Sequence, residues 1–156
     1  MTNLLQPQDS VAKSEINTLI VRRFLDEVVN AGNAALIDEL MTPDYEFHGG
    51  SLGDYQGLDA YKAFLAANGN GAFMNMHLEV IRIFARGDEV FVRFTNSGTH
   101  AGAFMGMPAS GKHALWNGTV LFRLENGKIA EATYIEDILH LLLQLAVKEL
   151  PDALRK

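Results

Sequence analysis

The chain has 156 residues, no cysteine and a formal net charge of −6, and 48% of its residues are hydrophobic. This length suits one domain with a core that needs no cross-links. The lack of thiols excludes disulfides, thiolate nucleophiles and cysteine-based zinc or iron–sulfur sites. The acidic balance argues against a nucleic-acid partner, because such proteins present a basic surface.

No segment predicts export or membrane insertion. The first thirteen residues lack a basic start followed by an apolar run, so we expect residues 1–13 to be a disordered tail and residues 14–150 to form a single domain. The most apolar stretch, residues 138–147, contains His140 and Gln144 and is too short to span a bilayer. We therefore expect a cytoplasmic protein with no membrane partner.

The first half of the chain has helical periodicity. Apolar residues recur at spacings of three and four between Ile16 and Val29, and Ser14 is a suitable N-cap for this helix. A second helix should end at Met41, before Thr42-Pro43, because a residue that precedes proline disfavours helical geometry. Three helices are predicted, over residues 14–31, 34–41 and 58–67. Residues 44–57 between the last two hold Tyr45, Phe47 and His48 and then a glycine-rich loop.

The second half changes to strand-like patterns and ends in a short helix. Residues 78–84 and 90–95 form one predicted hairpin, and residues 114–124 and 129–135 form another around Asn126-Gly127. The last helix is predicted over residues 138–150, ahead of Pro151. Helices followed by strands indicate an α+β domain, with a curved antiparallel sheet and helices on one face.

The Asn126-Gly127 turn predicts which residues share a face of the second hairpin. A two-residue loop pairs Glu125 with Lys128, which would place Asp137 opposite Trp116 and Ile135 opposite Gly118. The same face would carry Thr133 with Val120 and Glu131 with Phe122. A carboxylate among apolar groups has a raised pKa, as a general acid or base requires. This makes Asp137 the candidate catalytic residue.

Two alternatives to this interpretation of Asp137 stay open. Asp137 has equal claim to be the N-cap of the helix that follows it. A slip of one residue in the register would put Glu136 on the apolar face instead.

Other motifs carry less information. The run from Gly106 to Lys112 has the spacing of a phosphate loop, but His113 stands where the motif needs Ser or Thr, and a strand follows, so we reject nucleotide binding. The five histidines show no metal-binding spacing, so we assign no metal ligands, although a site assembled from distant strands stays possible. Arg93 either faces solvent or orients Asp137.

One stretch carries a family resemblance. Residues 98–112, GTHAGAFMGMPASGK, resemble the central signature of the SnoaL-like polyketide cyclases of the nuclear-transport-factor-2-like superfamily. The hairpin at residues 122–131 and the segment from Asp137 to Leu145 resemble the elements that follow this signature in the family. Thr133 and Ala146 depart from its usual tryptophan and glycine, which bears on the substrate more than on the fold.

The resemblance implies a cone-shaped fold in which a curved sheet and N-terminal helices enclose an apolar pocket. It also implies ring closure by intramolecular aldol condensation, with Asp137 as acid and base and no cofactor. The expected ligand is a small, apolar, carbonyl-containing or aromatic molecule. The candidate pocket residues that would bind it are His48, His77, Arg93, Trp116, Phe47 and Ile135.

Two alternative functions and an oligomeric state are also predicted. The same pocket suits a non-catalytic small-molecule binding domain, or an enzyme like the limonene-type epoxide hydrolases in which Arg93 and Asp137 would act on water. Leu121 and Tyr134 are expected on the outer face of the sheet. Together with family habit, they favour a homodimer or tetramer.

Overall fold

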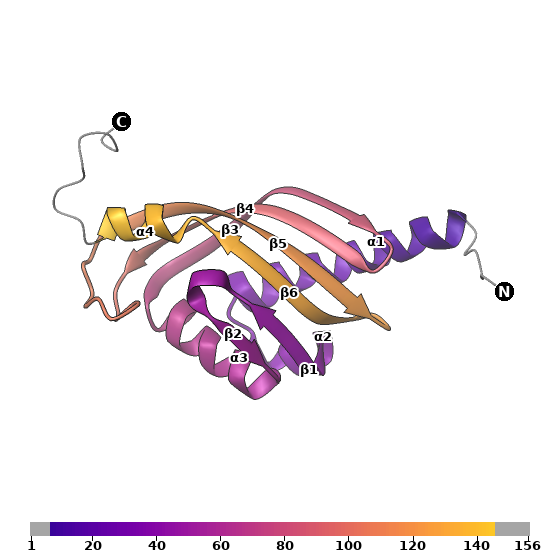
Figure 1. The fold of residues 1–156 in the computed structure, drawn as a ribbon, viewed down its shortest axis with the longest axis horizontal. Coiled ribbons are helices and arrows are strands. Elements are labelled where there is room, and N and C mark those ends of the chain that lie inside the picture. The colour runs from indigo at the N-terminus through magenta and orange to yellow at the C-terminus, as the bar shows by residue number, and fades with distance from the viewer. Residues whose placement is uncertain (1–6, 146–156) are drawn as a thin grey trace.

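The computed structural model describes residues 7–145, which form the α+β fold that the sequence predicts (Figure 1). The helical segments are α1 (Pro7–Arg23) with a π-helical continuation (Phe24–Asn30), a 3₁₀ turn (Ala34–Leu36), α2 (Ile37–Leu40), α3 (Leu58–Leu65) with a π-helical end (Ala66–Asn70), and α4 (Ile138–Leu145), with a further 3₁₀ turn at Gly50–Leu52. The strands are β1 (Met41–His48), β2 (Asp54–Gln56), β3 (Phe73–Arg86), β4 (Glu89–His100), β5 (His113–Glu125) and β6 (Lys128–Glu136).

The six strands form one curved sheet in the order β2-β1-β6-β5-β4-β3 (Figure 1). All neighbours pair antiparallel except β1 and β6, which are parallel. Helix α1 packs against β3 and β4, α3 against β1 and β2, and α4 against β5. The helices therefore cover the sheet on the side where the apolar side chains gather.

The N-terminal end of the domain differs from the sequence prediction where the structure describes it. Helix α1 begins at Pro7, so residues 7–13 are helical and Ser14 is not an N-cap. The Ser14 hydroxyl instead donates to the Ser10 carbonyl and accepts from the Gly87 N–H, both at 2.9 Å, which ties α1 to the β3–β4 turn. Residues 1–6 of the predicted tail, and residues 146–150 of the last predicted helix, lie outside the described range.

Strands β1 and β2 were not predicted. Tyr45 and Phe47 are buried and alternate with the half-buried Glu46 and His48, which is the two-residue period of a strand. The alternation is short and follows Pro43, so it stands out poorly in the sequence. Because β1 begins at Met41, the predicted second helix ends one residue earlier, at Leu40, and consists of a 3₁₀ turn followed by α2.

The β5–β6 hairpin contains a one-residue bulge at Ala130. Glu125 pairs with Lys128 and Leu124 with Ile129, as predicted, but Arg123 then pairs with Glu131. Ile129 and Ala130 are consequently both buried, and every later partner shifts by one residue. Among the pairs that follow, Gly118 lies opposite Glu136 and Val120 opposite Tyr134. The predicted pairing of Asp137 with Trp116 is therefore wrong.

The core consists of two clusters of buried side chains. The larger one joins α1 and α3 to the sheet and includes Phe24, Tyr45 and Phe122. The smaller one joins α4 to β5 and includes Phe73, Phe104 and Trp116. In residues 7–145, no helix combines the length and the apolar character that crossing a bilayer requires.

Candidate active site

A pocket separates the two core clusters. The larger cluster contributes Phe47, Tyr61 and Phe64 to its walls, and the smaller one contributes Phe104, Trp116 and Leu141. The space not filled by atoms is about 630 Å³, part of it open to solvent. Small-molecule sites are typically concave and mostly apolar, with a few polar groups that fix the ligand. This pocket has that character.

Glu136 is the acidic side chain in the described lining of the pocket. It is the last residue of β6, and its carboxylate oxygen Oε1 accepts hydrogen bonds from Trp116 Nε1 and Asn96 Nδ2, each at 2.9 Å. Both donors bind the same oxygen, so Oε2 has no protein donor among the described residues. The carboxylate is thereby held in one orientation with one oxygen available to a ligand.

Gly118 makes room for this carboxylate. It lies between Phe94 on β4 and Glu136 on β6, which are its partners across the sheet. A Cβ atom at this position would be 2.5 Å from Phe94 Cζ and 2.9 Å from Glu136 Cγ. Glycine is required here because of this close approach, since a larger side chain would displace one of the two neighbours.

The surroundings of Glu136 favour its protonated form. Burial against the apolar walls raises the pKa of Glu136, while the hydrogen bonds from Trp116 and Asn96 lower it and offset part of that rise. The group is therefore closer to the protonation equilibrium that proton transfer needs than an exposed glutamate is.

Two tyrosines contribute to the walls of the same pocket. Tyr61 of α3 and Tyr134 of β6 both line it. Burial raises the pKa of both phenols above the ordinary value of 10.0, with the neighbouring Tyr61 adding to the effect on Tyr134. Both hydroxyls therefore stay protonated at neutral pH and can donate to a ligand oxygen.

Asp137 occupies a different environment from the one expected. Its side chain is exposed, and its Oδ1 accepts the N–H of His140 at 3.0 Å, while its carbonyl accepts the N–H of Leu141 at 3.2 Å. This is the N-cap of α4. The expectation that Asp137 faces the pocket is wrong, because the bulge at Ala130 exchanges the two faces of β6.

The other predicted pocket residues divide into two groups. Phe47 and Trp116 line the pocket. Ile135 is 72% exposed on the outer face of the sheet, and Arg93 and His77 are exposed there on β4 and β3. His48 is also on that face, two residues from Glu46 on β1. Ile135, Arg93, His77 and His48 are therefore not pocket residues.

The structure also removes one alternative function and corrects the expected position of Tyr134. An epoxide-hydrolase-like site needs Arg93 and Asp137 together in the pocket, and neither is there. Tyr134, expected beside Leu121 on the outer face, is buried in the pocket, whereas Leu121 is 42% exposed. Homo-oligomer formation stays a prediction.

Several polar residues of the interior were missed by the sequence analysis. Asn96 is 3% exposed and His100 is fully buried, and the two share the inner face of β4. Strand β4 extends to His100, and its residues alternate between buried and more exposed from Val90 onward, whereas the predicted strand ends at Thr95. Glu136 had been named only as the outcome of a register slip.

A curved sheet closed by helices over an apolar pocket, with one buried carboxylate in the described lining, defines a class of small, cone-shaped α+β domains. The family description of the SnoaL-like polyketide cyclases matches residues 19–145. The chain belongs to the SnoaL-like polyketide cyclase family, and it has the nuclear-transport-factor-2-like fold.

Solved structures agree with this assignment. The "putative SnoaL-like polyketide cyclase" from Jannaschia sp. CCS1 is 26% identical, with a TM-score of 0.82 over 93% of this chain and 98% of that one. IdmH from Streptomyces antibioticus, a "putative polyketide cyclase", is 26% identical, with a TM-score of 0.70 over 84% and 99%. AclR from Streptomyces galilaeus, a "putative hydroxylase", is 24% identical, with a TM-score of 0.75 over 90% and 87%, and shares the fold. No curated protein matches the sequence.

Proposed function

We propose that this protein catalyses ring closure or isomerisation of a small apolar carbonyl compound, with Glu136 as the general acid and base. The carrying observation is the Glu136 carboxylate, which lies in an apolar pocket with one oxygen held by two donors and the other available. Family membership supports the reaction class, and the pocket supports the class of ligand. The residue differs from Asp137, which caps a helix in solvent.

The proposed reaction moves one proton from carbon to oxygen. Ionised Glu136 removes a proton from a carbon flanked by carbonyl groups, and the resulting enolate attacks a second carbonyl carbon of the same molecule. A carbon–carbon bond forms as that carbonyl π bond opens, and protonated Glu136 returns the proton to the new alkoxide oxygen. The reaction needs no oxidant or reductant, because the substrate as a whole neither loses nor gains electrons.

Neighbouring side chains have separate parts in this proposal. Trp116 and Asn96 orient the carboxylate through Oε1, so that Oε2 faces the reacting carbon. The phenols of Tyr61 and Tyr134 are donors for the oxygen on which charge develops. The aromatic walls exclude water from the enolate.

The test compares two adjacent carboxylates. Glu136→Gln keeps the size of the side chain but cannot transfer a proton, and it should lower kcat with polyketide-type β-keto esters by about 10²–10⁴-fold. Asp137→Asn is the matched control, since asparagine caps helices as well as aspartate does, and it should retain activity. Thermal unfolding of both variants checks that they fold.

The outcomes discriminate between catalysis and simple binding. Equal turnover by the wild type and Glu136→Gln would refute the assignment of Glu136. Loss of activity in Asp137→Asn alone would restore the original candidate. Tight binding of these esters, seen as a raised melting temperature without any product, would favour the non-catalytic binding domain.

A further inference from the structure

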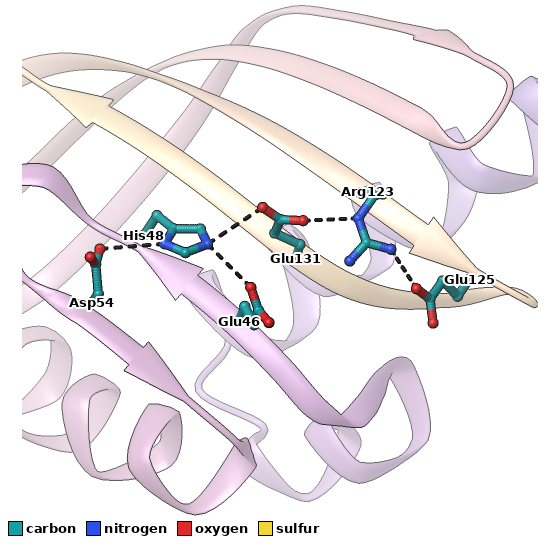
Figure 2. Close-up of polar contacts among 6 residues, drawn as sticks. All are labelled: Glu46, His48, Asp54, Arg123, Glu125 and Glu131. Atoms are coloured by element: carbon teal, nitrogen blue, oxygen red, sulfur yellow. Dashed lines mark hydrogen bonds and ion pairs between the residues drawn. The ribbon is translucent and has the colours of Figure 1, made fainter.

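On the outer face of the sheet, an imidazole lies close to carboxylates from neighbouring strands (Figure 2). Tyr45 and Phe47 of β1 point into the core, so Glu46 and His48 point outward. Glu131 of β6 also points outward, and its Cα pairs with that of Glu46 across the parallel strands. Three side chains from two strands therefore converge on one point.

We propose that Glu46, His48 and Glu131 bind a divalent transition-metal ion of the Zn²⁺ type. His48 Nε2 lies 3.5 Å from Glu46 Oε2 and 3.4 Å from Glu131 Oε1, and the three ligand atoms all lie within 4.8 Å of one another. The metal is no part of the proposed ring closure.

These distances fit a metal site better than hydrogen bonds. A hydrogen bond from an imidazole nitrogen to a carboxylate oxygen is shorter, at about 2.7–3.2 Å. Tetrahedral zinc with ligands at about 2.0–2.2 Å has its ligand atoms about 3.3–3.6 Å apart, because the edge of a tetrahedron is about 1.6 times the distance from centre to corner. Both separations around Nε2 fall within that range.

Two charged residues flank the cluster, and one of them, Arg123, is hydrogen-bonded to a proposed ligand (Figure 2). Asp54 of β2 pairs with His48 across the strands, and its Oδ1 lies 3.4 Å from His48 Nδ1. Arg123 Nε donates to Glu131 Oε2 at 2.8 Å, which directs Oε1 toward His48. Metal-binding histidines and carboxylates commonly have such second partners.

The charges around the site also favour a cation. Glu46 and Glu131 are direct neighbours across the strands, where like charges destabilise a sheet. Asp54 adds a third carboxylate within reach of His48, while Arg123 is shared between Glu131 and Glu125. A dication between Glu46 and Glu131 would remove their repulsion and add a side-chain link between β1 and β6, which already pair through their backbones.

The donor set selects the type of ion. One imidazole nitrogen and two carboxylate oxygens suit Zn²⁺ and its first-row neighbours, whereas Ca²⁺ and Mg²⁺ require six or more oxygen ligands. The side chains of Glu46, His48 and Glu131 are 30–46% exposed, so water can complete the coordination. The expected site therefore takes one Zn²⁺ with three protein ligands.

Isothermal titration calorimetry of the full chain with ZnCl₂ tests the proposal. The wild type should bind one equivalent, and its melting temperature should rise with Zn²⁺. His48→Gln and Glu131→Gln should each weaken binding by at least tenfold and abolish the rise in melting temperature. His77→Gln, which changes an exposed histidine on β3, is the matched control and should bind as the wild type does.

Three results would overturn the proposal. The first is the absence of saturable Zn²⁺ binding, in which case the cluster is a network of ion pairs around His48. The second is binding that His48→Gln and Glu131→Gln leave unchanged. The third is equal binding of Mg²⁺, which would indicate attraction of cations to an acidic surface. Each leaves the proposal for Glu136 intact, because ring closure in the pocket is assayed with metal-free protein and a chelator.

Discussion

Replacing Gly118 by alanine perturbs the packing that positions Glu136. An alanine Cβ would lie 2.5 Å from Phe94 Cζ and 2.9 Å from Glu136 Cγ, closer than carbon atoms approach without displacement. Phe94 is 1% exposed, and its ring packs edge-on against the ring of Tyr134, with 6.1 Å between the two ring centroids. The Phe94 ring therefore has little freedom to move. The alanine methyl therefore forces strain on β4, on Glu136, or on both.

The expected magnitude follows from the cost of overpacking. One extra methyl group in a closely packed core costs about 1–3 kcal/mol. For a chain of this size, each kcal/mol lowers the melting temperature by about 2–4 °C, so Gly118→Ala should melt about 2–12 °C below the wild type. A misplacement of the carboxylate by about 1 Å would also lower kcat up to about 100-fold.

Urea unfolding and turnover of Gly118→Ala, Phe94→Leu and the double variant form the assay. Leucine lacks the ring atom that meets the new methyl group, so Phe94→Leu should relieve part of the strain. The double variant should then be more stable than the sum of the single effects predicts, by about 0.5–3 kcal/mol. Wild-type stability and activity in Gly118→Ala, or strict additivity in the double variant, would refute the close packing described here.

Two further predictions concern Asp137 and the ionisation of Glu136. Asp137→Ala removes the N-cap of α4 and should lower the free energy of unfolding by about 1 kcal/mol. Asp137→Asn keeps a capping side chain, so its free energy of unfolding in urea should stay within a few tenths of a kcal/mol of the wild type. Equal effects of the two changes would contradict the capping role. Because burial raises the pKa of Glu136 above 4.5, the folded state holds this proton more tightly than the unfolded state. Relative to Glu136→Gln, the wild type should therefore lose stability as pH rises from about 4.5 through the higher folded pKa, and then level off. Urea titrations of both proteins from about pH 4 to about pH 8 measure this difference, and a gain with rising pH would contradict it.

Much of the fold was predictable because its local signals are strong. Asn126-Gly127 and Gly87-Asp88 mark two hairpins, and the spacing of apolar residues marks α1 and α3. Strand β1 was not predictable in the same way. It is stabilised by parallel pairing with β6, more than eighty positions later in the chain, and its own pattern amounts to Tyr45 and Phe47.

The site was predictable in kind but not in residue. The hairpin turn predicts an acid beside Trp116 near the end of β6, but that acid is Glu136 and not Asp137. Phe47 and Trp116 line the pocket. The acid in the pocket is Glu136, because the bulge at Ala130 shifts the register of β6 by one residue. This bulge depends on packing around Ile129 and Ala130, which the turn residues do not encode. The predictions for the other expected pocket residues are wrong partly for the same reason. Side chains alternate between the two faces of a strand, so an error of one residue puts a side chain on the wrong face.

The bulge at Ala130 accounts for the position of both proposed sites. Without it, the pairing of Glu125 with Lys128 would continue along β6, and Glu131 would point into the core beside Phe122 while Glu136 pointed outward. With one extra residue, Glu131 instead lies outside next to Glu46, and Glu136 lies inside next to Trp116 and Asn96. One inserted residue in β6 thus keeps the charged Glu131 out of the main core. It also places the Glu136 carboxylate in the pocket, next to hydrogen-bond donors on β4 and β5.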